Sequence, residues 1–133
     1  MIGMENSDYI LELTDGLFYF QFKKNTVIDY KLARYLVETR KRITRNEPFL
    51  MLFNGDNITN VTKDARDFFA SKEATDGIIA GAFIVNSPLT VVLSNFFITI
   101  SKPKKPAKLF TDKAEAIKWL RAFQNEQKKI IAK

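Results

Sequence analysis

The stretch GIIAGAFIVNSPLTVVLSNFFITIS, residues 77–101, largely decides how this chain folds. It contains no charged side chain, although 27% of all residues are charged. A membrane-spanning helix needs about 20 consecutive apolar residues. Here Asn86-Ser87-Pro88 divides the stretch into apolar runs at 78–85 and 89–100, both too short to span a bilayer. We therefore expect a buried strand over 78–85, followed by a helix over 87–101 that Ser87 caps and Pro88 begins.

Strands and helices alternate before this segment. The runs YILEL (9–13) and LFYFQF (17–22) are rich in strand formers, and the turn at 14–16 predicts that they form a β-hairpin. Amphipathic helices are expected over 30–44 and 63–72, with Asp29 and Thr62 as their N-caps. The outer face of the first helix is expected to carry Lys31, Arg34, Glu38, Lys41 and Arg45.

The remaining segments complete an α/β pattern. FLMLF (49–53) shows no polar alternation, so we expect it in the middle of a sheet. AKLF (107–110) predicts a short strand before a last helix, and residues 127–133 are expected to fray. The order β-β-α-β-α-β-α-β-α predicts a single α/β (α+β) domain over 1–133. Its mixed sheet should have about five strands, with helices packed on it.

The composition excludes several kinds of chemistry. The chain has no histidine and no cysteine, so it has no imidazole base, no thiol nucleophile, no disulfide and no zinc–thiolate site. The closely spaced acids Asp64 with Asp67 and Asp112 with Glu115 are interpreted as surface ion-pairing groups. We predict no catalytic residue, no metal site and no cofactor.

The net charge of +6 comes from dispersed lysines and arginines, with local runs at 40–45, 102–108 and 128–129. A positive field favours anionic partners in general. No aromatic–basic or glycine-rich RNA-binding motif accompanies these runs, so we interpret them as solvated surface and do not expect nucleic-acid binding.

The expected helix over 87–101 has two unlike faces. One face is apolar and belongs to the core. The other face is small, apolar and neutral where a solvated helix would carry charge; it contains Ser87, Val91, Ser94, Asn95, Ile98 and Lys102. Such a face is typical of a contact surface. It could be covered by the C-terminal tail, form a homodimer centred on Val91 and Ile98, or border a ligand cavity.

Several segments resemble a known family. They are TKDARDFFAS (62–71), the stretch from Ala82 to Asp112, and EAIKWL (115–120). Together with the element order, they resemble STAS domains and, more specifically, a SpoIIAA-like family of small uncharacterised bacterial proteins. That fold is related to the lipid-binding CRAL-TRIO fold. The resemblance runs from the hairpin to the last helix.

The resemblance implies a non-enzymatic domain that binds partner proteins, nucleotides or lipids. Some STAS domains are switched by phosphorylation of a Ser or Thr where the chain enters the helix after the central strand. The matching stretch here is NVTKDAR (60–66), which lacks the Asp-Ser-Ser/Gly signature. We therefore interpret Thr62 as a helix cap and not as a phosphorylation switch.

Two functions follow as hypotheses. The first is a cytoplasmic, non-catalytic domain that acts by binding a partner protein or by forming a homodimer through Val91, Ser94, Asn95, Ile98 and Lys102. The alternative is a CRAL-TRIO-like module that binds a small molecule or lipid in a cavity lined by Phe83, Phe96 and Phe97. Neither hypothesis requires a cofactor or a membrane span, and the N-terminus shows no signal peptide.

Overall fold

The computed structural model describes residues 2–86 and 105–132, with side chains described for 3–86 and 105–124. The helix expected over 87–101 therefore lies outside the described residues.

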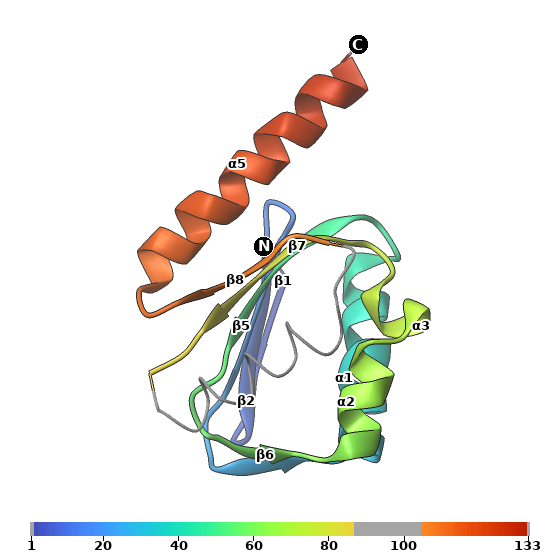
Figure 1. Cartoon of the computed structure of the whole chain (residues 1–133), viewed down its shortest axis with the longest axis vertical. Coiled ribbons are helices and arrows are strands. Elements are labelled where there is room, and N and C mark those ends of the chain that lie inside the picture. The colour runs from blue at the N-terminus through green and yellow to red at the C-terminus, as the bar shows by residue number, and fades with distance from the viewer. Residues whose placement is uncertain (1, 87–104, 133) are drawn as a thin grey trace.

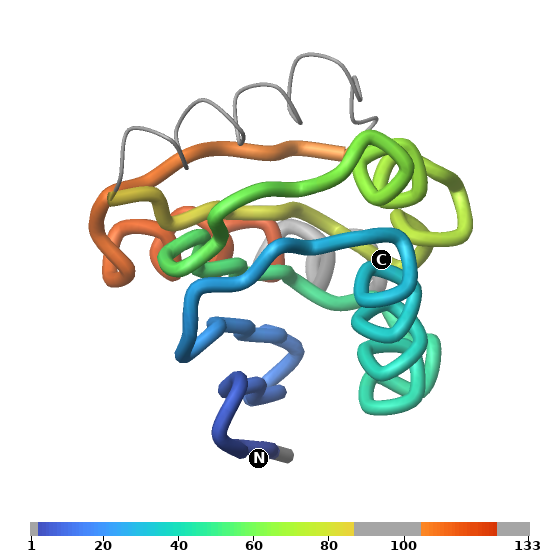
Figure 2. Tube along the Cα trace, turned by 90° about the horizontal axis from the view of Figure 1, so that it is seen from below, coloured from blue at the N-terminus to red at the C-terminus, as the bar shows by residue number. Residues whose placement is uncertain are grey.

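A six-stranded mixed sheet forms the centre of the molecule, in the order β1-β2-β3-β5-β7-β8. Its strands are β1 (Ile2–Glu5), β2 (Tyr9–Thr14), β3 (Leu17–Phe22), β5 (Phe49–Asn54), β7 (Ile78–Ile84) and β8 (Ala107–Phe110). The first three strands are antiparallel neighbours, and β3, β5, β7 and β8 are parallel. Figure 2 shows the N-terminal hairpin at one end of this sheet and β8 at the other.

The helices cover both faces of the sheet. Helices α1 (Tyr30–Thr44), α2 (Lys63–Phe69) and α3 (Lys72–Thr75) lie on one face, and α5 (Lys113–Ala132) lies on the other (Figure 1). A small parallel pair, β4 (Thr26–Ile28) and β6 (Ile58–Val61), leads into α1 and α2. The caps form as predicted, because Asp29 and Thr62 accept hydrogen bonds from amides in the first turns of α1 and α2.

Side chains alternate between the two faces of the sheet along the central strands, and each face has its own hydrophobic core. On β3, Phe18, Phe20 and Phe22 face α1 and α2, whereas Leu17 and Tyr19 face α5. The rings form a packed aromatic layer, with Phe20 stacked on Phe53 at a centroid distance of 5.4 Å. On β5, Leu50 and Leu52 are fully buried under α5, which confirms that this strand lies in the middle of the sheet.

The structure departs from the sequence-based expectation in three places. Strand β1 and the β4–β6 pair were not predicted. The helix expected over 63–72 ends at Phe69, and the separate helix α3 begins after Ser71, whose hydroxyl accepts from the Ala74 amide. Helix α5 is continuous to Ala132, and fraying of 127–133 stays a prediction.

One residue of the basic run at 40–45 is not solvated. Arg40 is only 6% exposed, and its guanidinium lies 5.0 Å from the ring centroid of Phe49. Its Nη2 donates to the Ala74 carbonyl at 2.6 Å, whereas its buried Nε has no hydrogen-bond acceptor among the residues that the structure describes. Burial lowers the pKa of Arg40 to about 10. The interpretation of 40–45 as solvated surface was therefore wrong for this residue.

Candidate functional site

The sites predicted from the sequence fall mostly outside the described residues. This holds for Val91, Ser94, Asn95, Ile98 and Lys102 of the contact surface, and for Phe96 and Phe97 of the cavity.

Phe83 is the cavity residue that the structure describes. It is half-buried on β7, its ring centroid is 6.4 Å from that of Phe53, and it faces the side of the sheet that α1 and α2 cover. A Cβ built on the neighbouring Gly81 would lie 3.8 Å from Cε of Met51 and 3.9 Å from Cε2 of Phe83. These residues form an apolar strip across β5 and β7.

The segment that matches the STAS switch is occupied by capping interactions. The Thr62 hydroxyl accepts from the Ala65 amide and donates to the Asp64 carboxylate. Asp67 pairs with Lys63 at 3.0 Å on the exposed side of α2. These contacts account for the polar groups at the start of α2.

A more informative surface lies on α1. All the exposed residues of α1 and its C-cap lie on one side of the helix, and we call this surface the α1 face. It consists of Tyr30, Lys31, Tyr35, Glu38, Arg42 and Arg45. Tyr30 is 40% exposed and Tyr35 is 47% exposed. Each ring thus presents part of its apolar surface to solvent on a face that otherwise carries charged residues.

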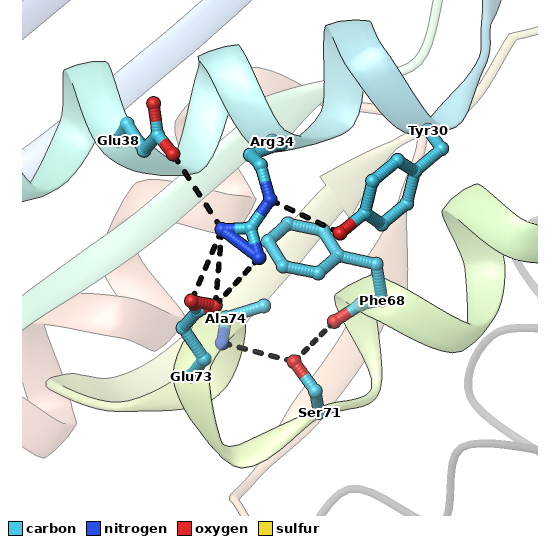
Figure 3. A network of polar contacts seen from close by, with 7 residues as sticks. All are labelled: Tyr30, Arg34, Glu38, Phe68, Ser71, Glu73 and Ala74. Carbon is cyan, nitrogen blue, oxygen red and sulfur yellow. Dashed lines mark hydrogen bonds and ion pairs between the residues drawn. The ribbon is translucent and has the colours of Figure 1, made fainter.

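Arg34 fixes one border of the α1 face (Figure 3). Its Nη atoms contact both carboxylate oxygens of Glu73 at 3.1–3.3 Å, and its Nε donates to the Tyr30 hydroxyl at 3.0 Å. Its guanidinium also lies 4.9 Å from the ring centroid of Phe68. The Tyr30 ring meets Phe68 edge-on at 5.5 Å, so Tyr30 is held in place from two sides. This network joins α1 to α2 and α3.

Tyr9 and Met4 fix the opposite border. The hydroxyls of Tyr9 and Tyr35 are 3.2 Å apart, and Tyr9 also donates to the Met4 sulfur at 3.4 Å. Burial, together with the hydrogen bond to Tyr35, raises the pKa of Tyr9. Tyr9 therefore stays neutral and keeps its hydroxyl proton at physiological pH. Met4 is itself 41% exposed, so it extends the apolar surface beside Tyr35.

The charges between the two tyrosines are mainly positive. Glu38 contacts Arg34 at 3.5 Å. Lys31, Arg42 and Arg45 form no ion pair with any described residue, and Arg42 donates only to the Thr39 hydroxyl at 3.4 Å. The α1 face thus combines two fixed aromatic rings with three cations that have no carboxylate partner in the described part of the chain.

A second polar cluster lies at the carboxyl ends of the parallel strands. The Tyr19 hydroxyl donates to Gln21 at 2.7 Å and accepts from the Asn54 amide at 3.3 Å, while Asn54 Oδ1 accepts from the Asp56 amide. The Lys113 ammonium lies 4.0 Å from the ring centroid of Tyr19. Burial raises the pKa of Tyr19, so this phenol acts as a neutral donor. Because the buried polar groups satisfy one another, we interpret the cluster as a tie between strand ends.

The described residues contain neither a cluster of acidic residues suited to a metal ion nor a membrane-spanning helix. Within 2–86 and 105–132, no group of three or more acidic residues is placed to hold a metal ion. None of the described helices is long and apolar enough to cross a membrane.

A family model matches residues 11–124, which is most of the chain. The chain belongs to the DUF7793 family. This family is described as a domain of unknown function, and the match begins within β2 and ends within α5, so it includes the α1 face. No curated protein matches the sequence.

A solved structure confirms the fold of this DUF7793 domain. It is described as an uncharacterized protein of the DUF3478 family with a SpoIIAA-like fold, from Shewanella loihica PV-4. The two chains are 16% identical, with a TM-score of 0.61 over 84% of this chain and 91% of the other. At this identity the likeness shows the fold alone. It confirms the SpoIIAA-like fold that the sequence resemblance implied.

The two exposed tyrosines of the α1 face were not predicted, although the helical pattern of the sequence indicates the exposure of Tyr35. On a helical wheel, Tyr35 lies beside Lys31 and Arg42 and away from Ala33 and Val37. A large aromatic residue on the charged side of an amphipathic helix is the pattern that would have predicted this surface.

Proposed function

We propose that this DUF7793 domain is a cytoplasmic, non-catalytic binding module that acts by protein–protein interaction through the α1 face. The observation that carries the proposal is the exposure of Tyr30 and Tyr35 on the two borders of a helix that is otherwise polar on its outer side. Met4, which is linked to Tyr35 through the Tyr9 hydroxyl, adds a third exposed apolar side chain.

The residue types and their rigidity support the proposal. Tyr, Met and Arg are enriched at protein interfaces relative to the rest of the surface. Tyr30 and Tyr35 are each hydrogen-bonded to a neighbour, so they lose little side-chain entropy when a partner covers them. A preorganised surface of this kind gains more binding free energy per contact than a mobile one.

Site-specific photo-crosslinking in the source organism tests the proposal. Benzoylphenylalanine replaces Lys31 on the α1 face or, as a matched control, the exposed Lys118 on α5. We expect a discrete cross-linked product from position 31 that disappears when Tyr35 is also changed to Ala. Equal products from positions 31 and 118, or a product that is insensitive to Tyr35→Ala, would contradict the proposal.

Self-association through the helix expected over 87–101 is a separate proposal, and it rests on the sequence. Its neutral face would place Val91 and Ile98 at the centre of a two-fold contact, with Ser94, Asn95 and Lys102 around them. Size-exclusion chromatography with light scattering should show a dimer for the wild type and a monomer for Val91→Glu/Ile98→Glu. A monomeric wild type would exclude this homodimer.

Binding of a small molecule or lipid is the second candidate function. The half-buried strip of Met51, Phe53 and Phe83 beside Gly81 favours it, because apolar side chains line most ligand sites. Native mass spectrometry of protein purified without denaturant should then show a bound ligand whose occupancy falls in Phe83→Ala. A mass equal to that of the bare chain in every preparation would count against it.

A further inference from the structure

Lys31, Arg42 and Arg45 are the charged residues of the α1 face that have no ionic partner among the described residues. Arg42 and Arg45 lie at the C-terminal end of α1, where positive charge is favoured by the helix dipole. Lys31 lies in the first turn, where the dipole disfavours a cation and where the carboxylate of the N-cap Asp29 offsets this effect.

The other charges near this surface are already used within the fold. Arg34 forms a fork with Glu73 and contacts Glu38, so neither the guanidinium nor the two carboxylates are free for a partner. What a partner meets is therefore Lys31 and Arg42 on the same face of the helix as the rings of Tyr30 and Tyr35.

We propose that the partner of the α1 face is an acidic protein segment whose Asp or Glu side chains pair with Lys31 and Arg42 while an apolar side chain packs against Tyr35 and Met4. This inference rests on the proposed function and specifies the chemistry of the partner. Charge complementarity of this kind determines which partners can approach and how fast they associate.

The same charges disfavour two other occupants. A two-fold contact between two copies of the α1 face would bring Lys31 and Arg42 of both copies together, and like charges at an interface cost binding free energy. A nucleic-acid duplex would use the cations, but its phosphate backbone would leave Met4 and Tyr35 without apolar partners. An acidic segment with apolar residues matches both the charge and the exposed rings.

Selection of random dodecapeptides displayed on phage, with the full chain as bait, tests the proposal. We expect the selected peptides to be enriched in Asp and Glu together with an aromatic or aliphatic residue. Their affinity should fall at least tenfold for Tyr35→Ala and for Lys31→Glu/Arg42→Glu, and should be unchanged for the control Lys118→Glu. Selection on Lys31→Glu/Arg42→Glu should instead enrich Lys and Arg.

The remaining outcomes separate this inference from the proposed function. Peptides that need Tyr35 but show no acidic enrichment would overturn the acidic partner and leave protein binding at the α1 face intact. Peptides whose affinity is unchanged by every α1 variant would overturn both the acidic partner and protein binding at the α1 face. A fluorescein-labelled DNA duplex that binds the wild type and is lost in Lys31→Glu/Arg42→Glu would also overturn the inference. Circular dichroism of each variant confirms that it folds.

Discussion

Arg40 provides a direct test of the energetics of the fold, through the substitution Arg40→Met. In the wild type, the guanidinium is buried between α1, the Phe49 ring and the end of α3, and its charge meets no carboxylate of the described residues. Methionine keeps the aliphatic stem and a polarizable contact with Phe49, and it removes the buried charge. We expect the variant to be more stable than the wild type.

The magnitude follows from the pKa of Arg40, which burial lowers to about 10. One pKa unit corresponds to about 1.4 kcal/mol, so the folded state disfavours the charged guanidinium by about 3 kcal/mol relative to the unfolded chain. Loss of the hydrogen bond to the Ala74 carbonyl opposes this gain by about 1 kcal/mol. The free energy of unfolding should therefore rise by about 1–2 kcal/mol at pH 7.

The pH dependence has a defined sign. Below pH 10 the guanidinium is protonated in both states, so the full penalty applies to the folded protein. Above pH 10 the folded protein releases this proton first, so the contribution of Arg40 to stability rises with pH. The difference between Arg40→Met and the wild type should consequently shrink above pH 10.

Urea unfolding at pH 7, followed by the fluorescence of the single tryptophan, Trp119, measures the effect. Arg40→Lys keeps a buried cation without the planar group and should be no more stable than the wild type. The exposed Arg42→Met serves as the matched control and should change stability by less than about 0.5 kcal/mol. A loss of 1 kcal/mol or more in Arg40→Met would show that the buried charge is compensated and would refute the reasoning.

Three further changes test other contacts. Thr62→Ala removes the cap of α2 and should lower the free energy of unfolding by about 1 kcal/mol, measured by urea unfolding; no change would show that Asp64 alone supplies the cap. A double-mutant cycle on Arg34→Met and Glu73→Gln should give a coupling of about 0.5–1 kcal/mol that weakens in high salt; zero coupling would contradict the fork of Figure 3. Ultraviolet titration should show phenols of Tyr9 and Tyr19 that ionise above the ordinary tyrosine value, and Tyr19→Phe should lose one of them; an unchanged titration would argue against burial of Tyr19.

Local sequence patterns predicted the elements whose signals are strong and local. The hairpin around Asp15 and Gly16, the caps at Asp29 and Thr62, and the apolar run 49–53 each carry their own signal, and the structure contains all of them. Strand β1 has no such signal, because its sequence IGME becomes a strand by pairing with β2. The strands β4 and β6 likewise lie far apart in the sequence and become strands by pairing with each other.

The exposure and contacts of the surface residues were harder to predict from the sequence, for a different reason. The charge of Arg40 suggested that it is solvated. Its spacing from Ala33 and Val37 instead places it on the buried stripe of α1. In the folded protein Arg40 is buried, so the helical spacing was the better guide. The exposure of Tyr35 was readable from the helical wheel. That Tyr9 and Met4 hold it in place depends on a contact between β1, β2 and α1 that no local pattern contains. The contact surface proposed at Val91 and Ile98 stays a prediction.

The comparison of photo-crosslinking from positions 31 and 118 tests the central claim most directly, because it asks whether the α1 face meets a partner in the cell. The account predicts a discrete adduct from position 31, its loss in Tyr35→Ala, and no such adduct from position 118. Adducts that are the same at both positions, or that persist in Tyr35→Ala, would contradict it.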